Sequence, residues 1–132
     1  MREHPLVLLL DDEKEFLEIA SMQLHTEGFE TVIAHTFDEA LAKAEEVHPD
    51  LILSDIYMPP EPNGWDLALA VKRDPKLQGT KIAFFSSLRD PKAELVSLRS
   101  REGAAELNDI PVFSKTDDVG ILHERIRTLF PS

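Results

Sequence analysis

Residues 51–64 read LILSDIYMPPEPNG, an apolar run that ends at an acidic residue and is followed by three prolines. Consecutive Leu and Ile residues without polar alternation are typical of a strand that is buried on both faces of a parallel sheet. The prolines cannot continue such a strand, so the chain is expected to turn away soon after Asp55. The stretch therefore predicts a buried strand that holds Asp55 at its carboxyl end.

Four further short, largely apolar runs are predicted to form strands, at residues 6–10, 31–34, 81–85 and 110–113. Helical patterns separate the five strands. After the first strand, an apolar stripe predicts a helix that Gly28 can close, and the stripe consists of Phe16, Ile19, Ala20 and Leu24.

The remaining helices follow the other strands in turn. Thr36 and Glu39 match a capping box at the start of the second helix, ahead of Phe37, Ala40, Leu41 and Ala44. A third helix is expected over 65–72, and a fourth begins near Pro91. The fifth carries Ile121, Leu122, Arg125, Ile126 and Leu129.

Five strand-helix units of this size predict an α/β, flavodoxin-like (βα)5 fold, a three-layer sandwich with a parallel sheet of order 2-1-3-4-5. Pro111 supports this order because proline cannot donate to a sheet ladder and belongs in an edge strand, here the fifth. No linker or repeat interrupts the pattern, so residues 1–132 are expected to form one domain.

Composition excludes several classes of protein. Lys and Arg number 14 against 25 Asp and Glu, and a net charge of −11 would repel the backbone of a nucleic acid. The chain has no cysteine for a disulfide or thiolate site, and its opening run LVLLL is too short for a membrane span or signal peptide. We expect a cytoplasmic protein with no membrane insertion and no direct nucleic-acid contact.

Polar residues follow the predicted strands and should converge at one edge of the sheet. They are Asp11, Asp12, Asp55, Ser86, Ser87 and Lys115. Each has a plain structural alternative, since Asp12 could cap a helix, Ser86 could end a strand and Lys115 could be solvated. Three carboxylates in one place would repel one another unless a cation lay among them, and oxygen-only ligands favour Mg²⁺.

Four short motifs occur in order at the strand ends: LVLLLDDEK (6–14), PDLILSDIYMP (49–59) with Gly64 after it, KIAFFSS (81–87) and FSK (113–115). Together they resemble the receiver domain of two-component response regulators, over nearly the whole chain. The resemblance implies that Asp55 is a phosphoacceptor that takes its phosphoryl group from a phosphohistidine of a histidine kinase or phosphotransfer protein. The domain would catalyse its own phosphorylation and dephosphorylation without being an enzyme in the usual sense.

The same resemblance assigns the rest of the site. Mg²⁺ would be held by Asp12, Asp55 and the backbone carbonyl of Tyr57, with Asp11 acting through water. Lys115 would neutralise a phosphoryl oxygen as a point charge. The hydroxyl of Ser86 would bond the new phosphoryl group and draw in the loop after the fourth strand, which signals to a downstream effector protein or fused effector domain.

Three departures from the family pattern bear on output. Thr116 stands where the family has a cis proline, which predicts a trans peptide bond or a strained cis one. Val112 occupies the place of the usual aromatic switch residue, and Phe113 is predicted to point to the opposite face of the sheet, so an aromatic toggle is predicted to be absent. The region of about residues 88–112 is longer than usual and predicts a remodelled output face.

Two other function classes stay open. A degenerate receiver could serve as a phosphorylation-independent protein-interaction module, which the unusual fifth-strand region favours. A small flavin-binding or hydrolase domain on a similar sheet is disfavoured, because DDEKE after the first strand would repel a phosphate.

Overall fold

The computed structural model describes residues 4–55, 64–86, 110–114 and 124–129 of the chain. The strands are β1 (Leu6–Leu10), β2 (Glu30–Ala34), β3 (Leu51–Asp55), β4 (Lys81–Ser86) and β5 (Val112–Ser114). The helices are α1 (Lys14–Thr26), α2 (Phe37–Val47), α3 (Gly64–Arg73) and the short 3-10 helix η1 (Pro75–Leu77). Residues 124–127 are also helical and are called the C-terminal helical turn below. No helix among these described ranges is long and apolar enough to cross a bilayer.

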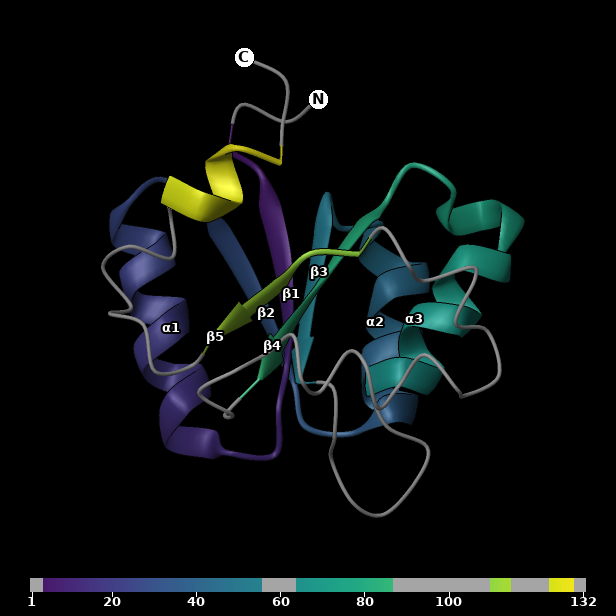
Figure 1. Ribbon diagram of the computed structural model, residues 1–132, viewed down its shortest axis with the longest axis horizontal. Coiled ribbons are helices and arrows are strands. Elements are labelled where there is room, and N and C mark those ends of the chain that lie inside the picture. The colour runs from purple at the N-terminus through teal and green to yellow at the C-terminus, as the bar shows by residue number, and fades with distance from the viewer. Residues whose placement is uncertain (1–3, 56–63, 87–109, 115–123, 130–132) are drawn as a thin grey trace.

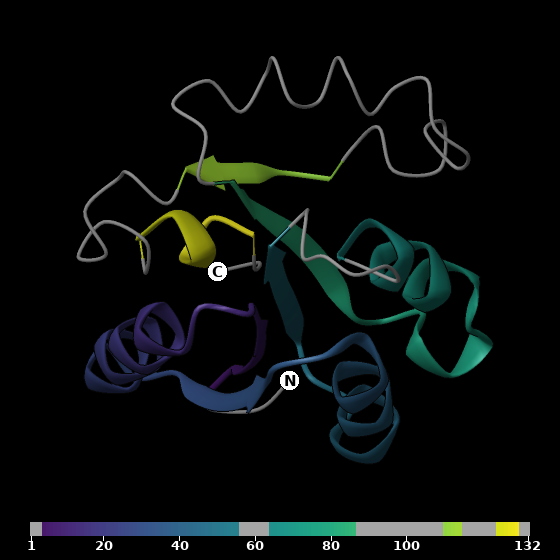
Figure 2. The same cartoon turned by 90° about the horizontal axis from the view of Figure 1, so that it is seen from below.

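All neighbouring strands are parallel, and their order is β2-β1-β3-β4-β5, as predicted. The sheet forms the middle of three layers (Figure 1). α1 and the C-terminal helical turn cover one face, and α2 and α3 cover the other, as the view from below confirms (Figure 2). The flavodoxin-like arrangement is therefore the fold of this chain.

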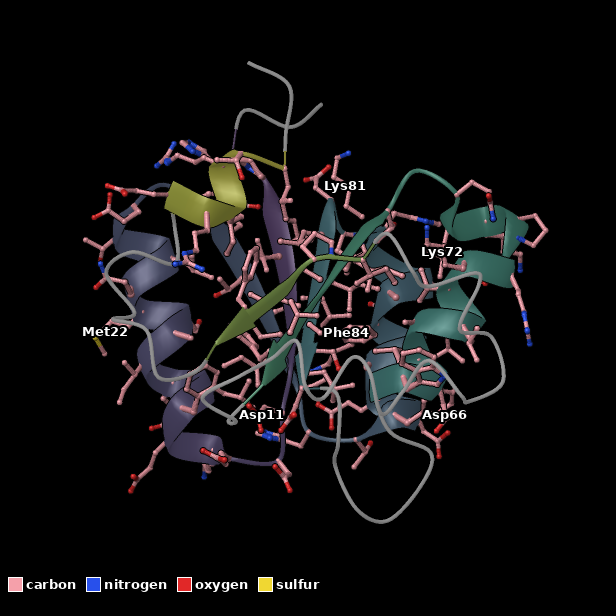
Figure 3. The ribbon with its side chains drawn as sticks, viewed as in Figure 1. Asp11, Met22, Asp66, Lys72, Lys81 and Phe84 are labelled. Atoms are coloured by element: carbon pink, nitrogen blue, oxygen red, sulfur yellow. The ribbon has the colours of Figure 1, made fainter. Side chains whose placement is uncertain are left out.

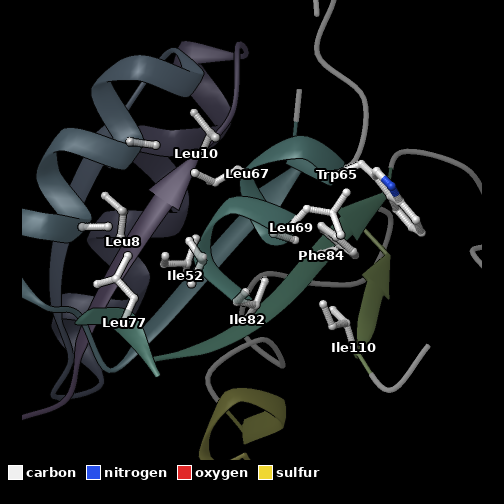
Figure 4. Packing of buried hydrophobic residues seen from close by; sticks show 14 of the residues in the cluster. Leu8, Leu10, Ile52, Trp65, Leu67, Leu69, Leu77, Ile82, Phe84 and Ile110 are labelled. Carbon is white, nitrogen blue, oxygen red and sulfur yellow. The ribbon is translucent and has the colours of Figure 1, made fainter. Parts of the chain in front are cut away.

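Strand alternation divides the core into two clusters, one for each face of the sheet. Leu8 and Leu10 of β1 pack toward α2 and α3, whereas Val7 and Leu9 pack toward α1. Side chains on a strand point alternately to opposite faces, which is why one all-apolar strand serves both layers. Figure 4 shows the cluster on the α3 side, where Trp65 stacks on Phe84 with ring centroids 6.2 Å apart.

Asp50 aligns the amino ends of the central strands. Its carboxylate accepts a hydrogen bond from Leu6 N at 2.8 Å, and its own N–H donates to Leu6 O at 2.9 Å. Its carbonyl in turn accepts from Lys81 N at 3.0 Å. Asp50 thus joins the starts of β1, β3 and β4. These hydrogen bonds help fix the register of the three strands, and the register determines which residues lie side by side at their carboxyl ends.

The first two helices largely follow their predicted patterns. Thr36 caps α2 and accepts a hydrogen bond from Glu39 N at 3.2 Å, and Gly28 has a φ of +96° after α1. The prediction was wrong for Ile19, whose side chain is 57% exposed. The buried face of α1 is instead formed by Leu17, Ala20 and Leu24, because the helix is rotated so that Ile19 faces outward.

The fifth strand is an edge strand, as expected, but it begins at Val112. Pro111 therefore lies just before the strand, where its carbonyl accepts a hydrogen bond from Phe84 N at 2.9 Å. A proline at this position costs no ladder hydrogen bond, since only its carbonyl takes part in the ladder. The predicted fourth helix near Pro91, and Ile121 and Leu122 of the fifth, lie outside the described residues.

Candidate functional site

Asp11 and Asp55 come together because their strands are neighbours in the sheet. Leu10 at the end of β1 is paired with Ser54 of β3. Asp11 directly follows Leu10, and Asp55 is the last residue of β3. Figure 3 shows Asp11 at one end of the molecule and Lys81, the first residue of β4, at the other. The site therefore lies beyond the carboxyl ends of the strands, as the fold predicts.

The two aspartates form a cluster with Asp12. One carboxylate oxygen from each residue lies within 4.8 Å of those of the other two. Their exposure differs: Asp11 is 0% exposed, Asp55 is 9% exposed, and Asp12 is exposed to solvent. The convergence predicted from the strand ends is thus present for all three acids.

Asp11 also shapes the turn that leads into α1. Its Oδ1 accepts a hydrogen bond from Glu13 N at 3.0 Å, and Glu13 is the N-cap residue, although its side chain does not cap the helix. Asp12 is therefore not the N-cap of α1, which removes its plain structural alternative. The side chain of Asp12 is left on the exposed side of the cluster.

Three carboxylates at these distances repel one another, and a bound cation would relieve the repulsion. The donor set consists of carboxylate oxygens, which suit a hard divalent cation such as Mg²⁺. Burial of Asp11 strengthens the effect because little solvent reaches its carboxylate to screen the charges. The cluster could therefore hold a metal ion.

The backbone of Asp55 is held by two residues to which the sequence analysis assigned no role. Ser54 Oγ donates a hydrogen bond to the Asp55 carbonyl at 2.9 Å. Gly64, the first residue of α3, approaches so closely that a Cβ there would lie 1.7 Å from the same carbonyl oxygen. The signals in the sequence were a serine inside the otherwise apolar run LILS and the glycine that follows the motif PDLILSDIYMP.

Aromatic residues pack beneath the site on the α1 face of the sheet. Phe85, which is paired with Asp55 in register, meets the ring of Phe16 edge-on at 5.0 Å. Phe113 is buried in the same cluster as Phe85, whereas Val112 packs on the opposite face. Phe113 and Val112 therefore point to opposite faces, as strand alternation predicted. The absence of an aromatic toggle stays a prediction.

For the other predicted site residues, the described part of the chain gives only the backbone of Ser86. Ser86 is the last residue of β4, and its backbone is paired with Ser114. Tyr57, Ser87, Lys115 and Thr116 lie outside the described residues, as does most of the region 88–112.

Comparison with known proteins bears directly on this arrangement. The family model of the response regulator receiver domain matches residues 7–105. The chain belongs to the response regulator receiver family. It is therefore a receiver domain of two-component signal transduction.

Relatives and solved structures agree with this assignment. The transcriptional regulatory protein TrcR of Mycobacterium tuberculosis is 43% identical over 53 residues, which cover 40% of this receiver domain and 21% of TrcR. The DNA-binding response regulator MtrA of the same organism is 30% identical over 94 residues, which cover 71% of this chain and 40% of MtrA. The chain thus spans less than half the length of these curated relatives.

Two solved structures have the same fold. Chemotaxis protein CheY4 of Vibrio cholerae superposes with a TM-score of 0.80 and 25% identity, covering 96% of this chain and 99% of CheY4. A CheY-like receiver domain protein of Methanospirillum hungatei superposes with a TM-score of 0.73 and 28% identity, covering 96% of this chain and 94% of that protein.

Proposed function

We propose that this receiver domain accepts a phosphoryl group on Asp55 from the phosphohistidine of a histidine kinase or phosphotransfer protein, with Mg²⁺ bound at the acidic cluster. The observation that carries the proposal is the convergence of Asp11, Asp12 and Asp55 within 4.8 Å at the carboxyl ends of neighbouring strands. Membership of the receiver family supports the same reading.

The three acids differ in a way that favours Asp55 as the nucleophile. Asp11 is fully buried and already accepts a hydrogen bond from Glu13 N, so its carboxylate is committed to the turn. Asp12 lies on the exposed segment after β1, without a strand to fix its direction. Asp55 ends a fully buried strand and retains 9% exposure, which combines a fixed backbone with access for a donor.

The reaction requires little covalent chemistry from the protein. A carboxylate oxygen of Asp55 attacks phosphorus in line, the P–O bond forms as the P–N bond of phosphohistidine breaks, and the leaving imidazole takes up a proton. Positioning of the attacking oxygen supplies much of the rate. When bound, Mg²⁺ would neutralise the charge that builds up between the carboxylates and the phosphoryl oxygens.

The remaining roles complete the proposal. Asp12, Asp55 and the backbone carbonyl of Tyr57 would hold Mg²⁺, with Asp11 acting through water. Lys115 would balance charge on the phosphoryl group, and the Ser86 hydroxyl would bond it and pass the change to a downstream effector protein or fused effector domain. The name of MtrA, a DNA-binding response regulator, supports an effector as the output. A cytoplasmic location and a single domain over 1–132 fit this role.

The test is intact-mass spectrometry after incubation with Mg²⁺ and acetyl phosphate or phosphoramidate. We expect the wild-type protein to gain one phosphoryl group, which is absent in Asp55→Asn and after addition of a chelator. Asp38→Asn, a change on the exposed first turn of α2, is the matched control and should retain the gain. Failure of the wild-type protein with both donors would overturn the proposal and favour the phosphorylation-independent interaction module.

A further inference from the structure

Ser54 is a polar residue in a strand that is otherwise apolar up to Asp55. It is 1% exposed and lies between Leu10 of β1 and Phe84 of β4 in the register of the sheet. A buried hydroxyl is costly unless it finds a hydrogen-bond partner. The partner here is the carbonyl of Asp55, at 2.9 Å. The one polar side chain inside β3 is therefore bonded to the backbone of the proposed phosphoacceptor.

Gly64, on α3, packs closely against the same carbonyl group of Asp55. A Cβ on Gly64 would lie 1.7 Å from Asp55 O, 2.8 Å from Asp55 C and 2.6 Å from Ser54 Oγ. Two of these three atoms belong to the backbone, so no side-chain rotation could relieve the clash. The first residue of α3 thus rests directly on the end of β3.

The side chains of Ser54 and Asp55 point to opposite faces of the sheet. Successive residues on a strand point to opposite faces, and Ile52, two residues earlier, belongs to the cluster under α2 and α3. Ser54 shares that face, whereas Leu53, two residues before Asp55, belongs to the cluster on the α1 side. Any effect of the Ser54 hydroxyl on chemistry at Asp55 must therefore pass through the backbone.

We propose that Ser54 and Gly64 are positioning residues that together hold the Asp55 carbonyl, and thereby aim its carboxylate at the acidic cluster. This inference rests on the proposed function for its consequence in phosphoryl transfer. The physical claim concerns geometry: without the hydroxyl, or with a methyl group at residue 64, the end of β3 shifts and the three carboxylates no longer meet at their present spacing. Misplacement of a reacting atom by about 1 Å costs on the order of 100-fold in rate.

The experiment compares Ser54→Ala with Ser21→Ala. Ser21 on α1 supplies the control loss of a partly buried hydroxyl away from the site, since its Oγ lies 2.5 Å from Oγ1 of Thr31 on β2. Mg²⁺ affinity is measured from the fluorescence of Trp65, the single tryptophan, which is 4% exposed and adjoins Gly64. The rate of phosphorylation by acetyl phosphate is measured at saturating Mg²⁺ and well below the melting temperature.

For Ser54→Ala we expect roughly 10-fold weaker Mg²⁺ binding and a rate lowered by about 10-fold to 100-fold. Ser21→Ala should lower only the melting temperature. Wild-type affinity and rate in Ser54→Ala would overturn the inference, because the hydroxyl would then serve only to satisfy its own burial.

Gly64→Ala is the second arm, with Gly79→Ala as its control because a Cβ at Gly79 meets nothing within 4 Å. We expect Gly64→Ala to lose on the order of 10 °C in melting temperature while Gly79→Ala does not. Equal melting temperatures for the two variants would overturn the role of Gly64.

A wild-type protein that takes no phosphoryl group would overturn the proposed function alone. The inference is then decided by Mg²⁺ affinity and by crystal structures of wild type and Ser54→Ala. A displaced Asp55 carboxylate would support it, and superimposable carboxylates would overturn it.

Discussion

The backbone of Asp55 is fixed by its neighbours, whereas its carboxylate is repelled by two other carboxylates. The backbone ends a fully buried strand and is contacted by Ser54 and Gly64. The carboxylate lies within 4.8 Å of those of Asp11 and Asp12. A rigid strand can keep like charges together that would separate on a mobile loop, so the site stores repulsion that a cation can relieve.

This repulsion predicts that Asp55→Asn stabilises the protein in the absence of a divalent cation. Removing one of three clustered negative charges should raise the free energy of unfolding by about 1 kcal/mol in a chelating, low-salt buffer. Thermal unfolding measures the change, and added salt should shrink it because salt screens the remaining charges.

Asp38→Asn is the control for this prediction, since Asp38 lies in the first turn of α2. A negative charge there interacts favourably with the helix dipole, so its loss should leave stability unchanged or slightly lower. An Asp55→Asn protein no more stable than wild type in chelator would contradict repulsion within the cluster.

Among the elements, α2 carries no residue of the site, and its start, buried face and end follow from its local sequence. Thr36 caps its start, Ala40 and Ala44 are buried, and His48 ends it in the left-handed region with a φ of 46°. Its outer face carries an ion pair between Glu39 and Lys43 at 2.9 Å, one helical turn apart. These features support the layer on which β3 and β1 rest.

The cap predicts the result of Thr36→Ala. Loss of the hydroxyl leaves Glu39 N without its partner, and we expect the free energy of unfolding to fall by about 1 kcal/mol. Urea unfolding at neutral pH measures the loss. Thr36→Ser retains the acceptor oxygen and should stay close to wild type; an equal loss in both variants would show that the methyl group matters instead.

The ion pair predicts a small pH dependence of stability. The hydrogen bond from Lys43 lowers the pKa of Glu39 below its ordinary value of 4.5, aided by the charge of Lys43 and opposed by partial burial. A lowered carboxyl pKa contributes stability above the unfolded-state pKa, and this contribution is lost as the pH falls through the lower, folded-state pKa.

Glu39→Gln should therefore be less stable than wild type at pH 7 by roughly 0.3–0.5 kcal/mol, because more than a third of the Glu39 side chain is exposed. The difference should disappear well below pH 4.5. Urea unfolding of both proteins across this range provides the measurement. A difference that persists in acid would point to packing and not to charge.

At the scale of the whole molecule, the C-terminal helical turn joins the far end of the chain to the first half of the fold. Ile126 is fully buried in the cluster that contains Leu17 and Phe85. Arg127 donates a hydrogen bond to the Glu27 carbonyl and lies over the Phe29 ring, 5.1 Å from its centroid. Residues about a hundred positions apart thus complete one layer of the sandwich.

This closure predicts that Ile126→Ala costs about 2–4 kcal/mol of unfolding free energy, since it leaves a cavity in a filled layer. Ile19→Ala is the matched control: the same side chain is removed, but from a position that is 57% exposed, so a change within about 0.5 kcal/mol is expected. Chemical denaturation compares the two. Similar losses would mean that Ile126 is less well packed than its burial indicates.

The sequence by itself determined the strands, their parallel order and the three aspartates that meet at their ends. Near-continuous apolar runs such as 6–10 indicate strands buried on both faces, and the side-chain period of two correctly assigned Val112 and Phe113 to opposite faces. Asp11, Asp12 and Asp55 were predicted to converge because they lie at the carboxyl ends of two strands that the predicted order places side by side.

Only the tertiary structure decided features that depend on contacts distant in the sequence. The helical stripe predicted Ile19 to be buried, yet the rotation of α1 against the sheet turned it outward in favour of Leu17. The contact of Gly64 with the Asp55 carbonyl arises from the docking of α3 onto β3, which residue spacing cannot express. Periodicity determines which residues share a face, whereas the relative placement of packed elements determines which atoms of that face touch.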